Sequence, residues 1–243
     1  MWKTFGGKCI YQSPTGIQVY QNVLFRWLKF NSRPLQTLIN RYMPHCPELY
    51  YVKPFTVFVR VKPASCCMLG LGGGGVAHAL WPYLGKIKVT AVENDCEVID
   101  IAQRYFMLDQ LYNLNVIHQD ARLFVEQTTE QFQHVLVDLF EAENFPLQCN
   151  NEAFFSHCKR ILLDSGILAI NLANREEQWP IMQLIKNNFH NTLAVAIKKS
   201  ANIVVFAVKN EPVDFLPTVL KQSKKLNALF WDSKWGQIAE ITG

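Results

Sequence analysis

The chain has 243 residues, enough for one large domain or for one domain with a small additional one. Hydrophobic residues make up 49% of it and charged residues 18%, which excludes an intrinsically disordered chain. The formal net charge is only +4 and the basic residues are spread along the sequence, so we expect no nucleic-acid groove.

Signals for a membrane, for secretion or for metal binding are not found in the sequence. No apolar run reaches the ~18 residues that a transmembrane helix needs, and the segment before Pro14 lacks the apolar core of a secretory signal. Seven cysteines without a C-x-x-C pair argue against a disulfide framework or a zinc cluster. No His, Cys and Asp cluster has metal-ligand spacing. We therefore expect a cytoplasmic protein with reduced thiols, no bound metal and no membrane partner.

Residues 1–50 predict a small antiparallel β-sheet domain. Three short β-rich runs, 16–21, 25–31 and 35–40, are separated by turn-forming residues. The proline-containing segment 41–48 predicts a linker. Residues 51–61 predict a helix that leads into a second domain, 51–243.

From residue 65 onward, apolar strand-like runs alternate with helical periodicity. The predicted strands are 66–71, 86–93, 115–119, 134–140 and 167–172, and the predicted helices are 76–84, 96–108, 121–127, 152–163 and 179–189. This alternation implies a parallel sheet covered on both faces. Residues 192–198 and 202–209 are too close for a parallel crossover and predict an antiparallel hairpin, and residues 219–229 predict a terminal helix. The fold class is α/β, with a Rossmann-like sheet of seven strands like that of the S-adenosylmethionine-dependent methyltransferases.

A glycine-rich turn follows the first predicted strand of this sheet. The run from Gly70 to Gly75 fits G-x-G-x-x-G, in which glycines let the backbone approach a ligand closely. Glu93 ends the next strand, where its carboxylate could accept hydrogen bonds from two ribose hydroxyls. Because no other pyrophosphate signal is found and a hairpin ends the sheet, an adenosyl nucleoside is favoured over NAD. The competing hypothesis is a tight turn with an incidental Glu.

Two further acids follow strands at the nucleoside end. Asp120 could accept from an adenine amino group or cap the helix that begins at Ala121, and the two roles are compatible. Asp95 is interpreted as an N-cap for the helix beginning at Cys96.

Three acids, Asp138, Glu141 and Glu143, end the fourth strand or follow it closely. Ligands of open α/β sheets bind at this edge, and the acids suit a cation such as an alkylamine or a sulfonium. A carboxylate there could orient an amine and accept its proton. The alternative is an acidic solvated loop with one capping Asp. The Asn/Asp-Pro-Pro-aromatic motif of base methyltransferases and the G-x-S-x-G of hydrolases are both missing.

On these motifs the chain resembles the spermidine synthase family of aminopropyltransferases over residues 16–209. The matching segments are residues 16–20, 25–28, 70–75 and 93–95, Gln36, Asp120-Ala121 and Asp138-x-x-Glu141. That family joins a small N-terminal β-sheet domain to a methyltransferase-like domain. It transfers an aminopropyl group from decarboxylated S-adenosylmethionine to putrescine.

The resemblance implies a role for each matching position. The residues that would bind the donor are Gln36, Gly70, Gly72, Gly73, Gly74, Glu93, Asp120 and Ala121, with Glu93 at the ribose and Asp120 at the adenine. Asp138 would be the base that activates the attacking amine. Tyr51 and Glu141 would bind the amine substrate. The donor, decarboxylated or ordinary S-adenosylmethionine, is a co-substrate, and a homodimer is implied.

The sequence also departs from the family. Gly73 stands where the family has an Asp, Val52-Lys53 replaces His-Glu, and residues 199–202 replace a Tyr-Pro-Ser-Gly-type loop. We expect a retained nucleoside pocket and an altered acceptor pocket. Three hypotheses stay open: an aminopropyltransferase, a methyltransferase of the same fold, which Gly73 favours, and a non-catalytic nucleoside-binding homologue.

Overall fold

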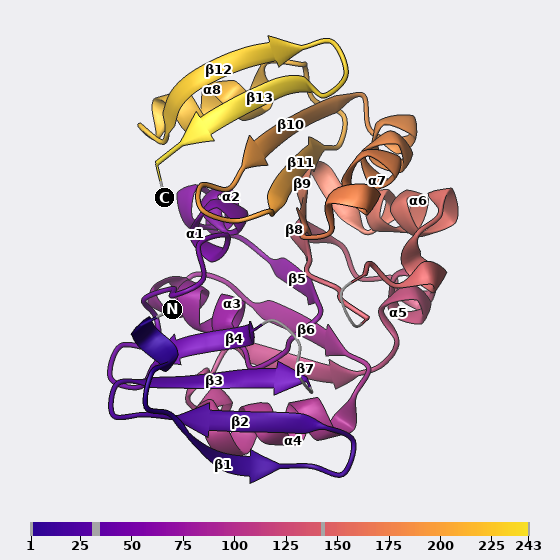
Figure 1. Ribbon diagram of the computed structural model, residues 1–243. Helices are drawn as coiled ribbons and strands as arrows, with labels where there is room; N and C mark the ends of the chain where they lie inside the picture. Colours follow the sequence, from indigo (N-terminus) through magenta and orange to yellow (C-terminus); the bar gives the residue numbers. More distant parts are fainter. Residues whose placement is uncertain (1, 31–34, 142–143, 243) are drawn as a thin grey trace.

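The computed structural model describes residues 2–30, 35–141 and 144–242 and contains two β-sheets (Figure 1). A four-stranded sheet forms the N-terminal part, and a nine-stranded sheet with helices on both faces forms the rest. The N-terminal sheet and a C-terminal hairpin, β12 (Leu226–Asp232) and β13 (Gly236–Ile241), lie at opposite ends of the molecule.

The N-terminal sheet is antiparallel and has the strand order β1-β2-β3-β4. Its strands are β1 (Lys8–Gln12), β2 (Ile17–Gln21), β3 (Phe25–Phe30) and β4 (Leu35–Asn40). The last three confirm predictions, although the predicted end at residue 31 lies outside the described residues. Strand β1 escapes prediction because its side chains are mostly exposed at the sheet edge and carry no apolar alternation.

One face of this sheet packs on α4 (Cys96–Tyr105), a helix of the second predicted domain. The buried cluster there consists of Ile17, Val19, Leu28, Ile39, Val98, Ile101 and Phe106. Because apolar surface from both parts is removed from water together, the sheet is held firmly on the central domain.

The predicted linking helix is divided into α1 (Val52–Phe55) and α2 (Val57–Val61). Thr56 lies between them with φ −92° and ψ 4°, and its hydroxyl donates to the carbonyl of Val52 at 2.8 Å. Val52 and Phe55 of α1 and Val57 and Phe58 of α2 are all buried in the core, so both halves keep the packing role expected of one helix.

The central sheet has the order β12-β13-β10-β11-β9-β8-β5-β6-β7. Five neighbouring strands are parallel: β9 (Leu162–Leu172), β8 (Phe132–Val137), β5 (Cys66–Leu69), β6 (Val89–Glu93) and β7 (Leu114–His118). Strands β10 (Asn191–Ala196) and β11 (Ile203–Val208) form the predicted antiparallel hairpin, with β11 beside β9. The predicted fold class is confirmed.

Helices and the linking segment cover both faces of this sheet. They include α3 (Gly75–Leu80), α5 (Ala121–Gln127), α6 (Glu152–Arg160), α7 (Arg175–Asn188) and α8 (Phe215–Gln222). Alternate residues of β5 enter two different cores: Cys66 and Met68 pack with α1 to α3, while Cys67 and Leu69 pack with α5 to α7. Such two-sided burial explains why β5 is an unbroken apolar run.

The C-terminal part corrects one prediction, because the sheet has two strands more than the seven expected. Helix α8 ends at Gln222, and Leu226–Leu229, predicted as the end of a terminal helix, belong to β12. Lys224 has φ 57°, a left-handed conformation that stops a helix. Strand β13 then pairs parallel to β10 and extends the sheet.

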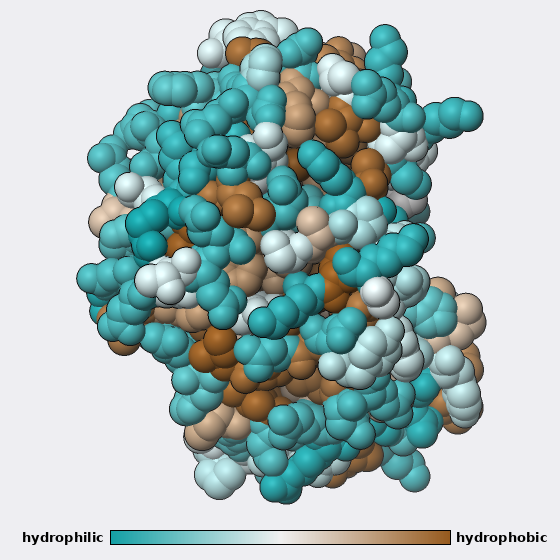
Figure 2. Space-filling view, turned by 180° about the vertical axis from the view of Figure 1, so that it is seen from behind, coloured by the Kyte–Doolittle hydropathy of each residue, from teal (hydrophilic) through white to brown (hydrophobic). Residues whose placement is uncertain are grey.

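Within residues 2–30, 35–141 and 144–242, no helix is both long enough and apolar enough to cross a membrane. Figure 2 shows the face opposite to that of Figure 1, on which hydrophobic residues form separate patches among hydrophilic ones.

Candidate functional site

A cleft of about 880 Å³ lies at the carboxyl ends of the parallel strands, where β4 of the N-terminal sheet approaches the central sheet. Most of the predicted site residues line it: Gln36, Tyr51, Gly70, Gly72, Glu93, Asp120, Ala121, Asp138 and Glu141. Gly73 and Gly74 do not. A Cβ atom at Gly74 would meet Leu108 at 2.6 Å, and one at Gly73 would meet Thr37 at 3.0 Å.

The glycine turn brings the backbone of β5 directly against that of β8. Gly70 has φ 94°, and a Cβ atom built on it would lie 2.3 Å from the carbonyl oxygen of Asp138. Only glycine fits there, because both the backbone angle and the contact exclude a side chain. The turn and Asp138 are therefore neighbours, because β5 and β8 lie side by side in the sheet.

Five consecutive amides of the glycine turn are used inside the protein. The five N–H groups from Gly70 to Gly74 donate, in chain order, to the Val92 carbonyl, twice to Glu93 Oε2, to Thr37 Oγ1 and to the Leu71 carbonyl. A diphosphate-binding loop must offer such amides to its ligand. This turn therefore favours a nucleoside over a dinucleotide.

Glu93 organises this end of the sheet. Its Oε2 accepts from Leu71 and Gly72 at 3.0 and 3.3 Å, and its Oε1 accepts from the amides of Asn94 and Asp95 at 3.0 and 3.2 Å. A carboxylate has about four acceptor sites, so ribose hydroxyls would compete with the two longer bonds. The ribose role remains a prediction, and so does the alternative hypothesis of a tight turn, which these bonds from Glu93 help to hold in shape.

Asp120 and Asp95 are both helix caps. Asp120 Oδ1 accepts from the amide of Leu123 at 3.0 Å, and Asp95 Oδ1 accepts from Glu97 at 2.8 Å. The capping hypothesis for each is confirmed. Asp120 also lines the cleft beside Ala121, so its adenine contact stays open as a prediction.

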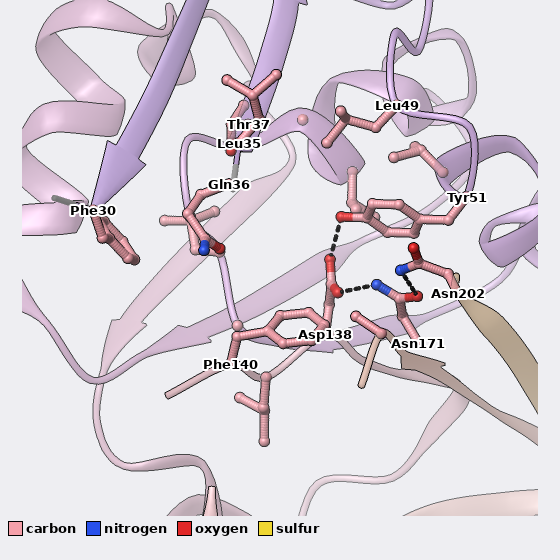
Figure 3. Close-up of a pocket in the computed structure, with 18 of the residues that line it drawn as sticks. Phe30, Leu35, Gln36, Thr37, Leu49, Tyr51, Asp138, Phe140, Asn171 and Asn202 are labelled. Atoms are coloured by element: carbon pink, nitrogen blue, oxygen red, sulfur yellow. Dashed lines mark hydrogen bonds between the residues drawn. The ribbon is translucent and has the colours of Figure 1, made fainter. Parts of the chain in front are cut away.

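Asp138 carries the chemistry of the cleft. Its half-buried carboxylate accepts from Tyr51 Oη at 2.7 Å through Oδ2 and from Asn171 Nδ2 at 2.8 Å through Oδ1 (Figure 3). Burial raises its pKa, while the bonds from Asn171 and Tyr51 act in the opposite direction. In the described part of the chain no ion pair neutralises this carboxylate.

Tyr51 stays protonated beside it. Burial, and then the negative charge of Asp138, raise the pKa of the phenol well above its usual range. Tyr51 is therefore a fixed hydrogen-bond donor, and the predicted substrate role would be exercised next to this bond.

The acidic loop after β8 is only partly described. Glu141 lines the cleft with an exposed side chain, and its backbone pairs with Asn144. Glu143 lies outside the described residues. Binding of an amine by Glu141 thus remains a prediction.

Three cleft residues escape the sequence patterns: Thr37, Asn171 and Asn202. Asn171 left a signal, a polar residue within the otherwise apolar run Ile167–Leu172 that ends β9. Asn202 Nδ2 donates to Asn171 Oδ1 at 2.8 Å, a contact that arises only when β9 and β11 pair. Thr37 carries no signal beyond its place in a strand.

Comparison with known proteins defines the class. Residues 42–227, more than half of the chain, match the spermine/spermidine synthase domain. The chain belongs to this family.

Curated relatives are transferases of two kinds. A polyamine aminopropyltransferase of Vibrio vulnificus is 29% identical over 177 residues, 68% of this chain and 57% of the relative. An eEF1A lysine and N-terminal methyltransferase homolog of Drosophila melanogaster is 27% identical over 157 residues, 59% of this chain and 23% of the relative. The chain thus spans little more than half, or less, of these relatives.

Solved structures share the fold. A probable spermidine synthase from Corynebacterium glutamicum has a TM-score of 0.72 at 18% identity, covering 84% of this chain and 81% of its own. A spermidine synthase in complex with the transition state analogue AdoDATO has a TM-score of 0.68 at 17% identity, and the match covers 85% of this chain and 75% of that one. Human methyltransferase-like protein 13 in complex with SAH has a TM-score of 0.61 at 18% identity, and the match covers 77% of this chain and 97% of that one.

Proposed function

We propose that this protein transfers an aminopropyl group from decarboxylated S-adenosylmethionine to an amine held at Asp138. The observation that carries the proposal is the half-buried Asp138 carboxylate, which lines the same cleft as Gly70 and Gly72 and has no counter-ion among the described residues. A carboxylate in that state attracts a cation and can take a proton from it.

The cleft residues suit an adenosyl sulfonium as co-substrate. The cleft volume of about 880 Å³ leaves room for a nucleoside and a small amine together. Glu93 and Asp120 are candidates for the ribose and the adenine. Gln36, from β4, also lines the cleft (Figure 3) and would face the chain attached to sulfur. The donor supplies an electrophilic carbon next to a positively charged sulfur.

The protein's own groups would act on the acceptor amine. Asp138 takes a proton from the ammonium, which frees the nitrogen lone pair for attack on that carbon. The new C–N bond forms as the C–S bond breaks. The electron pair of the C–S bond stays on sulfur, so the sulfonium leaves as a neutral thioether. Tyr51 and Asn171 hold the carboxylate oxygens in place, so positioning supplies much of the rate.

Methyl transfer from ordinary S-adenosylmethionine is the second candidate, and the contact between Thr37 and Gly73 favours it. Thr37 fills the space where a side chain at position 73 would lie, so this part of the turn carries no acid. The carboxylate of an ordinary donor meets no repulsion there. The methyltransferase among the relatives agrees with this candidate.

Calorimetric titration with both donors and with methylthioadenosine tests the proposal, together with mass spectrometry of products from a panel of amines. We expect tighter binding of the decarboxylated donor and a product heavier by an aminopropyl group. The reverse ranking with a methylated product would establish the second candidate. No affinity for any of the three compounds would instead support the non-catalytic homologue.

A further inference from the structure

The buried amide of Asn171 is the least expected polar group near the cleft. Asn171 is 1% exposed and lies at the apolar end of β9, where an unpaired amide would be costly. Both ends of its side chain are used: Nδ2 donates to Asp138 Oδ1, and Oδ1 accepts from Asn202 Nδ2, each at 2.8 Å (Figure 3).

The direction of these hydrogen bonds is set by Asp138. An ionised carboxylate only accepts, so Asn171 must present Nδ2 to it. Its Oδ1 then requires a donor, which Asn202 supplies. The remaining Oδ1 of Asn202 accepts from the hydroxyl of Ser200. Ser200, Asn202 and Asn171 thus form a one-way chain of donors that ends on Asp138, which we name the amide relay.

Resting on the function proposed above, we propose that Asn202 is a positioning residue that acts through Asn171 to keep the Asp138 carboxyl ionised and oriented in the cleft. Asn202 lies just before β11, in the turn that joins it to β10, and does not contact Asp138 itself. It fixes Asn171 in the one orientation that stabilises a negative charge. The hairpin thereby sets the basicity of Asp138, the residue that follows β8.

Among the described residues, no charged group pairs with Asp138, so the amide relay and Tyr51 are what stabilise its ionised form. Tyr51, from the linking segment, is the titratable group in contact with the carboxyl, and burial keeps it protonated. The charged residues that line the same cleft come from other elements: Glu48, Glu93, Asp95, Asp120, Glu141, Arg175, Glu176 and Lys199. None of them forms an ion pair with Asp138 in residues 2–30, 35–141 and 144–242. Hydrogen bonds from neutral donors therefore oppose the effect of burial.

The test compares Asn202→Ala and Asn202→Asp with the control Asp164→Ala. The control breaks another amide–carboxylate hydrogen bond, between Asn210 and Asp164, near the far ends of β9 and β11. Three measurements are made: the pH profile of kcat/KM for transfer, the affinity for methylthioadenosine, and titration of the Asp138 carboxyl by carbon-13 NMR. The NMR titration needs no activity, and the Asp138 signal is assigned with Asp138→Asn.

We expect Asn202→Ala to lower kcat/KM about tenfold at pH values below the pKa of the ascending limb. At pH values above that limb, kcat/KM of the variant should approach the parent value. The carboxyl should titrate about one pH unit higher, and methylthioadenosine affinity should stay within twofold. Asn202→Asp, which replaces the donor by a negatively charged acceptor, should act at least as strongly. Asp164→Ala should leave all three unchanged.

Superimposable NMR titrations of Asn202→Ala and the parent would overturn the inference. So would a loss of activity that is equal at every pH, because that is the signature of a merely structural role. If no amine is alkylated with either donor but the carboxyl still titrates higher in Asn202→Ala, the proposed function fails and the amide relay stands.

Discussion

Asp138 is the residue on which the proposed chemistry depends most directly. Exchange of Asp138 for Asn keeps the size of the side chain and leaves one oxygen to accept from Tyr51 or Asn171, but it removes the group that takes the proton. We expect Asp138→Asn to lower turnover by about 10²- to 10⁴-fold, the usual contribution of a general base. Donor affinity should change little, because Glu93 and Asp120 are untouched.

Steady-state kinetics and calorimetry check this expectation, with Asp164→Asn, an exposed carboxylate on β9, as the matched control. Turnover within twofold of the parent for Asp138→Asn would show that the base has been assigned to the wrong residue.

At the scale of elements, β4 is fastened to the glycine turn through Thr37. A Cβ atom at Gly73 would lie 3.0 to 3.1 Å from three atoms of Thr37, tighter than ordinary contact. We expect Gly73→Ala to destabilise the fold by about 1–3 kcal/mol through overpacking. Combining it with Thr37→Ala removes two of the three close atoms, so the pair should cost less than the sum of the single changes.

A double-mutant cycle by denaturant unfolding measures that difference, and a coupling of at least about 0.5 kcal/mol is expected. Additive effects would mean that the turn moves away from β4 without resistance.

The elements also show what the sequence could and could not reveal. The five parallel strands and the β10–β11 hairpin were predictable, because two-sided burial gives apolar runs and a short connection forbids a crossover. Strand β12 was mistaken for helix, since Leu226, Leu229 and Phe230 also fit a helical spacing and only the left-handed Lys224 separates it from α8.

The site divides in the same way. Asp138, Glu93 and the glycines follow or end strands that are recognisable one at a time, and the carboxyl ends of parallel strands share one edge of the sheet, so their meeting there could be expected. Asn171 and Asn202 come together through the register of β9 with β11, in which Asn171 faces Val204. Register of that kind depends on side-chain packing across the sheet, which no single segment encodes.

On the scale of the whole molecule, the predicted boundary between residues 50 and 51 divides a shared core. Besides the apolar cluster on α4, Tyr11 and Thr15 donate to the two oxygens of Glu97 at 3.0 and 2.7 Å. We therefore expect both predicted domains to unfold in one transition. The boundary itself, and the homodimer implied by the resemblance, remain predictions.

Scanning calorimetry tests this cooperativity through equality of the calorimetric and van't Hoff enthalpies. Ile101→Ala, at a fully buried position between the two parts, should shift that single transition to lower temperature by removing about 2–5 kcal/mol. A separate early transition of the N-terminal sheet would contradict the expectation.

Acid should weaken the fold through two buried histidines. Burial lowers the pKa of His134 to about 4 and also lowers that of His78, and each Nε2 bonds a backbone carbonyl. Because the unfolded chain binds these protons near pH 6.5, stability is fully present above that pH and falls between pH 6.5 and 4. His134 alone accounts for about 3 kcal/mol at the lower end.

Denaturant unfolding at several pH values measures this loss. His134→Gln, which keeps a donor for the Lys62 carbonyl, should flatten the slope between pH 6.5 and 4. Asp138, with a raised pKa, contributes with the opposite sign in the acidic range. A slope identical to that of the parent would exclude His134 as the cause.

The internally bonded glycine turn has a consequence for how affinities are to be interpreted. A loop whose amides already have partners does not have to be ordered when a molecule arrives, so little conformational entropy is lost on association. Differences in dissociation constant between adenosine derivatives would then report their direct contacts, together with any exchange of the Gly72 bond at Glu93 for a bond to ribose. We therefore expect the floor of the cleft to be ordered before a molecule binds, and selectivity to come from the walls that surround it.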